Sequence, residues 1–263
     1  MSESAPIGRS FTPRGIRYNS PSKREIYSLA RLLHLQCQAA YHHLRVIQPS
    51  EQLLSVPARR IAEDFMDRTG PRDPAILIRI LLNAMLIHHS PTLHHQKHVG
   101  ELVRRLCDEL RINNGKTSVL VQAALVHDSG KLLIPTNLLD MRTEGPASNE
   151  ERAKIEFIKI GHLFFGYHLL RSLDLPNNLT TLVGRHHYMN NYQPLEFAGL
   201  PATTEDQILV VADNFDALTK GRGYRDGNFV SNASALETIS SLPVEREIID
   251  ALRRLTMPAA SAR

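Results

Sequence analysis

The stretch ALVHDSGKLLIPTNLL, residues 124–139, joins an apolar helical run to a histidine and an aspartate, with a lysine three positions after the aspartate. Polar groups at the end of such a run are costly to bury unless each finds a partner. His127 and Asp128 therefore mark either an ordinary helix end or half of a metal site whose other ligands lie elsewhere in the chain. The rest of the sequence distinguishes these two interpretations.

Helical spacing of apolar residues continues on both sides of this stretch, and strand signals are few, so the sequence predicts an all-α fold. Pro57 lies inside one expected helix and predicts a kink or a division there. The expected helices cover about residues 22–46, 50–68, 74 to a break at 90–91, 94–110, 117–128, 149–172, a segment ending near 187, 205–220 and 231–256. Residues 1–90 resemble a helical module of unknown role, and residues 91–263 carry every chemically suggestive group.

Composition restricts the classes of protein. Hydrophobic residues make up 42% and charged residues 22% of the 263, as in ordinary globular domains. A formal net charge of +4 suits an anionic ligand but is too weak to indicate a nucleic-acid polymer. The apolar stretch 75–87 is interrupted by Arg79 and is too short to predict membrane insertion. Cys37 and Cys107 lie in helical patterns and form no disulfide framework, and no secretory leader is visible, which together predict a cytoplasmic location.

Thirteen histidines are present, and they are unevenly placed. A single histidine on a helix is more often a surface or satisfied core residue, and His34, His88 and His89 are interpreted in that way. Other histidines and two aspartates lie within or just after buried-looking segments, where pairing through a metal would remove the cost of burial. The candidate ligands are His94, His98, His127, Asp128, His162, His186, His187 and Asp213.

This ligand set predicts the kind of metal centre. Imidazole and carboxylate together suit Fe, Mn, Zn or Ni rather than Ca or Mg. Eight candidates exceed the needs of one ion, so the sequence predicts two or three divalent ions, with Asp128 as a bridging carboxylate. Adjacent metal ions are suited to phosphoester hydrolysis because they can activate a water and bind both the attacking and the leaving oxygen.

Four motifs follow one another in a recognisable order. HD-x-GK-x-x-IP at 127–135 is followed by HLFFG at 162–166, RHHYM at 185–189 and VADNFDALTKGRGYR at 211–225. Together they resemble the HD superfamily of metal-dependent phosphohydrolases, and more closely the HD-GYP family of cyclic di-GMP phosphodiesterases, over about residues 94–255.

This resemblance implies an HD-domain helical bundle with an N-terminal helical extension, and iron or manganese as the metals. It matches His98 and the later candidates to the family's metal ligands. Asp128 and Lys131 become catalytic residues, and Lys131 also contacts substrate phosphate. Arg222 and Arg225 fall where the family has phosphate-binding basic residues, although a solvated loop is the plain alternative.

Two departures from the family pattern stand out. The position four residues before the first matched ligand is His94, where three-metal members have glutamate, so two metals compete with three and His95 is an alternative ligand. HHYMNNYQPLEFAGLP, residues 186–201, lacks the GYP loop, and Tyr188 stands in place of a glutamate. Tyr188 or Tyr192 could replace the family's tyrosine, or both could be plain loop aromatics.

The leading functional hypothesis is a metal-dependent phosphodiesterase that hydrolyses a cyclic dinucleotide, with cyclic di-GMP first. One alternative is an HD-type phosphohydrolase acting on another nucleotide, which the missing GYP loop favours. Another is a catalytically weak nucleotide-binding signalling domain, which the retained ligand set disfavours. The N-terminal helices could form a homodimer or regulatory module, or could be a simple helical extension.

Overall fold

The computed structural model of the chain describes residues 21–43, 51–70, 72–141, 148–190, 193–220 and 230–257. Within these ranges the regular elements are all helical, which confirms the predicted all-α fold. The helices are α1 (Lys23–His43), α2 (Glu51–Thr69), α3 (Pro74–His88), α4 (Ser90–Glu109), α5 (Asn114–Val126), α6 (Thr136–Leu139), α7 (Asn149–Glu156), α8 (His162–Ser172), α9 (Asn177–Arg185), α10 (Thr204–Thr219), α11 (Asn232–Ser240) and α12 (Arg246–Thr256).

The helices begin where the sequence supplies caps. The Asp73 carboxylate accepts a hydrogen bond from the amide of Ala75 at the start of α3, and Asn113 caps α5 in the same way. Thr203 and Asp206 form a reciprocal capping box at the start of α10. These caps satisfy amide groups that have no partner inside the helix.

Several predicted boundaries differ from the observed ones. α4 begins at Ser90, about four residues earlier than predicted, because Pro91 fits the first turn of a helix, where no amide donor is needed. α2 continues through Pro57, so the predicted division does not occur. The single helix predicted over 231–256 was wrong: it is two helices, since Pro243 cannot donate a backbone hydrogen bond and disfavours helix in the residue before it.

The single helix predicted over 149–172 is also interrupted. One wide π-helical turn, Phe157–Gly161, separates α7 from α8. Such turns insert an extra residue into a helix and often occur at functional sites. His162 follows this turn directly.

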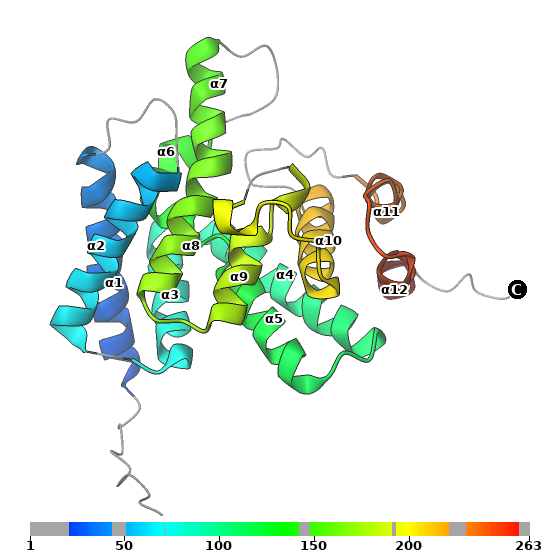
Figure 1. The fold of residues 1–263 in the computed structure, drawn as a ribbon, viewed down its shortest axis with the longest axis horizontal. Coiled ribbons are helices and arrows are strands. Elements are labelled where there is room, and N and C mark those ends of the chain that lie inside the picture. The colour runs from blue at the N-terminus through cyan, green and yellow to red at the C-terminus, as the bar shows by residue number, and fades with distance from the viewer. Residues whose placement is uncertain are drawn as a thin grey trace, which may run out of the picture.

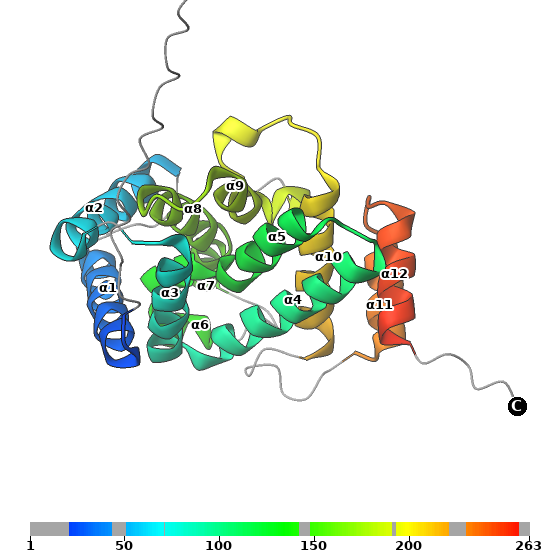
Figure 2. The same ribbon diagram turned by 90° about the horizontal axis from the view of Figure 1, so that it is seen from below.

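α1, α2 and α3 lie at one end of the molecule, and α11 and α12 lie at the other (Figure 1). Between them are α4, α5, α8, α9 and α10, and α4 runs across the molecule from α3 toward α12 (Figure 2). α8 packs against α2 and α9, and α5 packs against α4 and α9.

A single hydrophobic cluster extends through these helices. It includes Leu33 and Phe65 before residue 90, and Phe165 and Leu252 after it, all fully buried. The predicted boundary at residue 90 therefore lies within a shared core, and the division into two domains stays a prediction. None of the described helices is long and apolar enough to cross a membrane.

Candidate metal centre

The motif residues meet where several helix ends converge. His127 follows α5 and begins the HD loop, which is defined here as residues 127–135 and contains a short 3₁₀ helix, Ser129–Leu133. His162 begins α8, His186 and His187 follow α9, and Asp213 lies inside α10. Except for half-buried His187, these motif residues are buried.

The HD loop lies directly against the backbone of α8. A Cβ atom on Gly130 would lie 1.7 Å from the carbonyl oxygen of His162, a distance that no rearrangement of a side chain could relieve. On the other side of the contact, a Cβ on Gly166 would approach the Gly130 nitrogen to 2.9 Å. Glycine at both positions therefore brings the loop carrying Asp128 to the helix carrying His162.

Three histidines share one hydrogen-bonding arrangement. The Nδ1 atoms of His127, His162 and His186 lie 2.8, 2.5 and 2.6 Å from the carbonyl oxygens of Ala124, Ile158 and Val183, respectively. A carbonyl oxygen only accepts, so each Nδ1 carries the proton and each Nε2 carries a lone pair. Carbonyls near helix ends lack helical partners, which is why His127 and His186 find acceptors there.

The resulting lone pairs point at one another. The Nε2 atoms of His162 and His186 are 3.4 Å apart, and neither can donate to the other in this tautomer. The Nε2 atom of His127 is buried without a hydrogen-bond partner and lies 3.5 Å from Asp128 Oδ2. Acceptors facing acceptors in a buried site are balanced by a cation, so the residues fit divalent metal ions with nitrogen and oxygen ligands.

Among the described residues, potential ligand atoms gather in two groups: His162, His186 and His187, and His95, His127 and Asp128. The two oxygens of Asp128 face different groups. Oδ1 lies 3.5 Å from His162 Nε2, and Oδ2 lies 3.5 Å from His127 Nε2. This is the geometry of a carboxylate that can bridge two ions.

α4 contributes His95 to this cluster rather than the two histidines in the predicted set. His95 Nε2 lies 2.9 Å from Asp213 Oδ1, and its Nδ1 lies 2.7 Å from Asp216 Oδ2. His94 is exposed, and the side chain of His98 is 55% exposed, with Nδ1 3.6 Å from Asp216. Of the three, only His95 belongs to a group of potential ligand atoms, so the structure does not bring His94 and His98 into the cluster.

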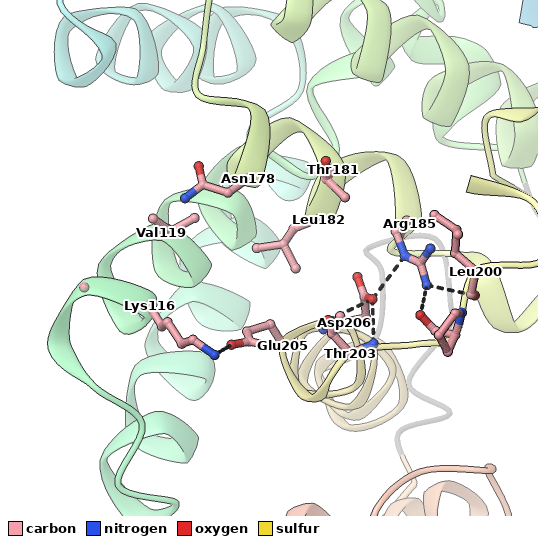
Figure 3. A pocket seen from close by; sticks show the side chains of 12 residues that line it. Lys116, Val119, Asn178, Thr181, Leu182, Arg185, Leu200, Thr203, Glu205 and Asp206 are labelled. Atoms are coloured by element: carbon pink, nitrogen blue, oxygen red, sulfur yellow. Dashed lines mark hydrogen bonds and ion pairs between the residues drawn. The ribbon is translucent and has the colours of Figure 1, made fainter. Parts of the chain in front are cut away.

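Two further residues near the candidate ligands were not singled out in the sequence. Asp216 forms a hydrogen bond with His95. Its position one turn after Asp213 on α10 is the sequence feature that could have indicated this role. Buried Arg185, which precedes the paired histidines, contacts Asp206 through Nε at 3.0 Å and the Pro201 carbonyl at 3.0 Å. Figure 3 shows the bonds of Arg185 beside a cavity of about 560 Å³, which is lined by the first turns of α5 and α10 and by residues along α9.

Of the remaining predicted site residues, Lys131 is buried, with Nζ 2.5 Å from Asp128 Oδ2. Tyr188 is half-buried and its ring lies 5.8 Å from the Arg185 guanidinium, so it packs beside the ion pair. Arg222, Arg225 and Tyr192 lie outside the described residues.

Burial and charge shift the pKa values of this cluster in opposite directions. Burial lowers the pKa of His162 to about 3 and that of His186 to about 4. Burial alone would also lower the pKa of His95, but hydrogen bonds to Asp213 and Asp216 raise it to about 9. For Asp128, burial opposes ionisation, yet Lys131 and the neighbouring histidines hold its pKa well below the usual range.

Comparisons with known proteins identify the family of the chain. Residues 79–242 match the family model for the HD domain, which is more than half of the chain, so the chain belongs to the HD domain family. It is 25% identical over 187 residues to 3'3'-cGAMP-specific phosphodiesterase 1 of Vibrio cholerae, covering 70% of this chain and 40% of that protein. It is 25% identical over 205 residues to cyclic di-GMP phosphodiesterase of Thermotoga maritima, covering 74% of this chain and 53% of that protein.

The chain spans about half the length, or less, of these curated relatives. Among solved structures, it is similar to Bd1817, a HDG"Y"P protein from Bdellovibrio bacteriovorus. That similarity has a TM-score of 0.49 and 17% identity, and covers 90% of this chain and 74% of the other.

A methyl group at Gly130 is expected to separate the HD loop from α8. Gly130→Ala should lower the free energy of unfolding by about 3 kcal/mol or more, because backbone must move to relieve the overlap. Gly115→Ala is the control, since its Cβ would meet only ordinary contact at 3.4 Å near the start of α5. Urea unfolding measures both, and equal stability of the two variants would contradict the packing argument.

The adjacent residues His94 and His95 of α4 allow a direct test of which histidine is a metal ligand. His95→Gln is expected to lower metal content, because the imidazole facing Asp213 is lost. His94→Gln should retain wild-type metal content, because His94 is exposed. Mass spectrometry of metal in matched anaerobic preparations measures the difference. Loss of metal in the His94 variant with retention in the His95 variant would reverse the assignment.

Stability of the metal-free protein should depend on pH in two directions. His162 and His186 have lowered pKa values, so their neutral forms stabilise the fold above pH 6.5 and that contribution is lost as pH falls toward 4. The raised pKa of His95 gives a contribution that is complete below pH 6.5 and lost as pH rises through about 9. Urea unfolding from pH 4.5 to 9.5 should therefore show a maximum near neutrality, and a curve still rising at pH 9 would contradict the His95 contribution.

Proposed function

We propose that this chain is a metal-dependent phosphodiesterase that opens a cyclic dinucleotide, with cyclic di-GMP as the first substrate to test. The observation that carries the proposal is the position of Asp128, whose two oxygens face two separate groups of imidazoles. Two relatives that are named as phosphodiesterases of cyclic dinucleotides support the substrate class.

The residues that would hold the metals are His95, His127, Asp128, His162, His186, His187 and Asp213. Two ions are the proposed number, because the described residues offer two ligand groups. Nitrogen and oxygen ligands without thiolate suit Fe, Mn, Zn or Ni, and the motif resemblance makes iron or manganese the proposed choice. Such ions, when bound, supply Lewis acidity and lower the pKa of water so that it attacks at neutral pH.

The chain's own residues prepare this chemistry. The carbonyls of Ala124, Ile158 and Val183 fix three imidazoles in the tautomer that exposes Nε2. Asp216 orients His95 in the same way. Burial of the cluster strengthens every charge interaction within it.

Lys131 is proposed to stabilise the negative charge that develops on the phosphate. Its ammonium already lies at the bridging carboxylate, next to where a phosphate would approach the metals. During hydrolysis the water oxygen forms a bond to phosphorus and gives up a proton, one ribose oxygen–phosphorus bond breaks, and the leaving oxygen takes up a proton. Arg222 and Arg225 remain proposed phosphate contacts on the strength of the motif resemblance alone.

The second candidate is a phosphohydrolase acting on another nucleotide. It is favoured by the segment after the paired histidines, which lacks the GYP loop and is tied through the Leu200 and Pro201 carbonyls to Arg185. A catalytically weak binding domain would be expected to lose ligands, whereas this chain brings seven together.

The test is turnover by anaerobically purified protein reconstituted with Mn²⁺ or Fe²⁺. Cyclic di-GMP, 3'3'-cGAMP and cyclic di-AMP are compared with nucleoside monophosphates and triphosphates, and products are separated by chromatography. Hydrolysis of a cyclic dinucleotide supports the proposal. Turnover of other nucleotides alone selects the second candidate, and no turnover at full metal occupancy selects the binding domain.

Lys131→Met should reduce kcat by about 10²-fold, in the range seen when one charge-stabilising donor is removed from an active site. Lys116→Met is the matched control. Lys116, at the start of α5, forms an ion pair with Glu205. It lies roughly 16 Å from His127 along the axis of α5, at 1.5 Å per residue. Equal activities for both variants would remove Lys131 from the proposed mechanism.

A further inference from the structure

The HD loop contains two carbonyl groups that its own backbone does not satisfy. The carbonyl of Leu132 would ordinarily accept from the residue three positions later, but that residue is Pro135, which has no amide proton. The carbonyl of Ile134 loses its partner too, since the amide of Leu138 donates to Pro135 instead. Leu132 and Ile134 are fully buried, so these acceptors need donors from elsewhere in the protein.

Both donors come from helices that precede the motif region. Gln38 of α1 donates from Nε2 to the Leu132 carbonyl at 2.6 Å. His88 of α3 donates from Nε2 to the Ile134 carbonyl at 2.8 Å. α1 lies entirely before residue 79, where the match to the HD domain family begins.

A third residue fixes the donor form of His88. Because Nε2 of His88 carries the proton, its Nδ1 carries a lone pair. His34 Nε2 lies 3.2 Å from that Nδ1 and is the donor to it. His34, His88 and Ile134 thus form a chain of hydrogen bonds from half-buried His34 on α1 to the HD loop.

A further bond lies beyond the loop. His89 Nε2 lies 3.1 Å from Asp140 Oδ1, just after α6, while His89 Nδ1 lies 2.7 Å from Thr92 Oγ1 at the start of α4. The junction of α3 and α4 is therefore bonded to the chain on both sides of Pro135.

We propose that Gln38, His34 and His88 are positioning residues for the HD loop, through which the N-terminal helices set the placement of Asp128 and Lys131. The inference rests on the proposed function only in assigning metal and phosphate to those two residues. It makes α1 and α3 a part of the catalytic unit, so that a displacement of α1 would change metal affinity without touching a ligand.

Three loss variants test the proposal, with matched controls. Gln38→Leu and His88→Leu remove one donor each, and His34→Leu removes the donor to His88 at a less buried position. His88→Gln keeps an amide donor and should rescue. Thr180→Val is the control, because it removes another buried side-chain bond to a carbonyl, that of Asn177, away from the HD loop.

Two measurements are made on the full chain. Hydrogen exchange of the amides of residues 128–134 is followed by mass spectrometry in the metal-free protein, and Mn²⁺ affinity is measured by calorimetry. The leucine variants should exchange about tenfold faster in this segment and bind Mn²⁺ about tenfold more weakly, as when an outer hydrogen bond of a metal site is removed. His88→Gln and Thr180→Val should keep wild-type values in both measurements, whatever their thermal stability.

Wild-type exchange and affinity in the leucine variants would overturn the proposal, as would the same losses in Thr180→Val. If Gln38→Leu or His88→Leu fails to fold, the His34→Leu variant, at a less buried position, decides by the same criteria. If the wild-type protein binds no Mn²⁺, the proposed function fails, and the exchange measurement alone decides whether these residues position the loop.

Discussion

The contact between the backbones of Gly130 and His162 is the constraint on which the site depends. It requires a residue without Cβ in the HD loop, because a methyl group there would lie 1.7 Å from a carbonyl oxygen. The contact brings Asp128, at the start of the loop, to within 3.5 Å of the first imidazole of α8. A small increase in this separation would place the carboxylate out of reach of one of the two histidine groups. The proposed bridge between two metals therefore depends on close backbone packing.

Helix ends supply the electrostatic character of the centre. α5 and α9 both end in histidines whose Nδ1 protons go to carbonyls of the last turn, and the π-helical turn before α8 provides a similar acceptor for His162. Each imidazole thereby directs a lone pair inward. The cluster is unfavourable by itself, since buried acceptors face each other and burial prevents the imidazoles from taking up protons. Binding of divalent ions would convert this cost into affinity.

The N-terminal helices are linked to the HD loop both by hydrogen bonds and by a shared hydrophobic core. Pro135 ends the short 3₁₀ helix and removes a donor, and Gln38, 94 residues before Leu132 in the chain, supplies the missing hydrogen bond. The apolar residues of α1–α3 belong to the same cluster as those of α8. Helices that contribute no candidate ligand thus donate hydrogen bonds to the loop that carries Asp128.

The sequence alone determined the helical class, the order of motifs and the buried positions of His127, Asp128, His162, His186 and Asp213, because each follows or lies in an apolar helical run. It did not determine which of His94, His95 and His98 faces the site. That choice depends on where α4 begins and how it is rotated against α10, and Pro91 in the first turn set a start earlier than periodicity indicated. The contacts of Gln38 and Arg185 could not be predicted from the sequence either. Their roles depend on contacts between segments far apart in the chain, which only the packing of α1, α9 and α10 decides.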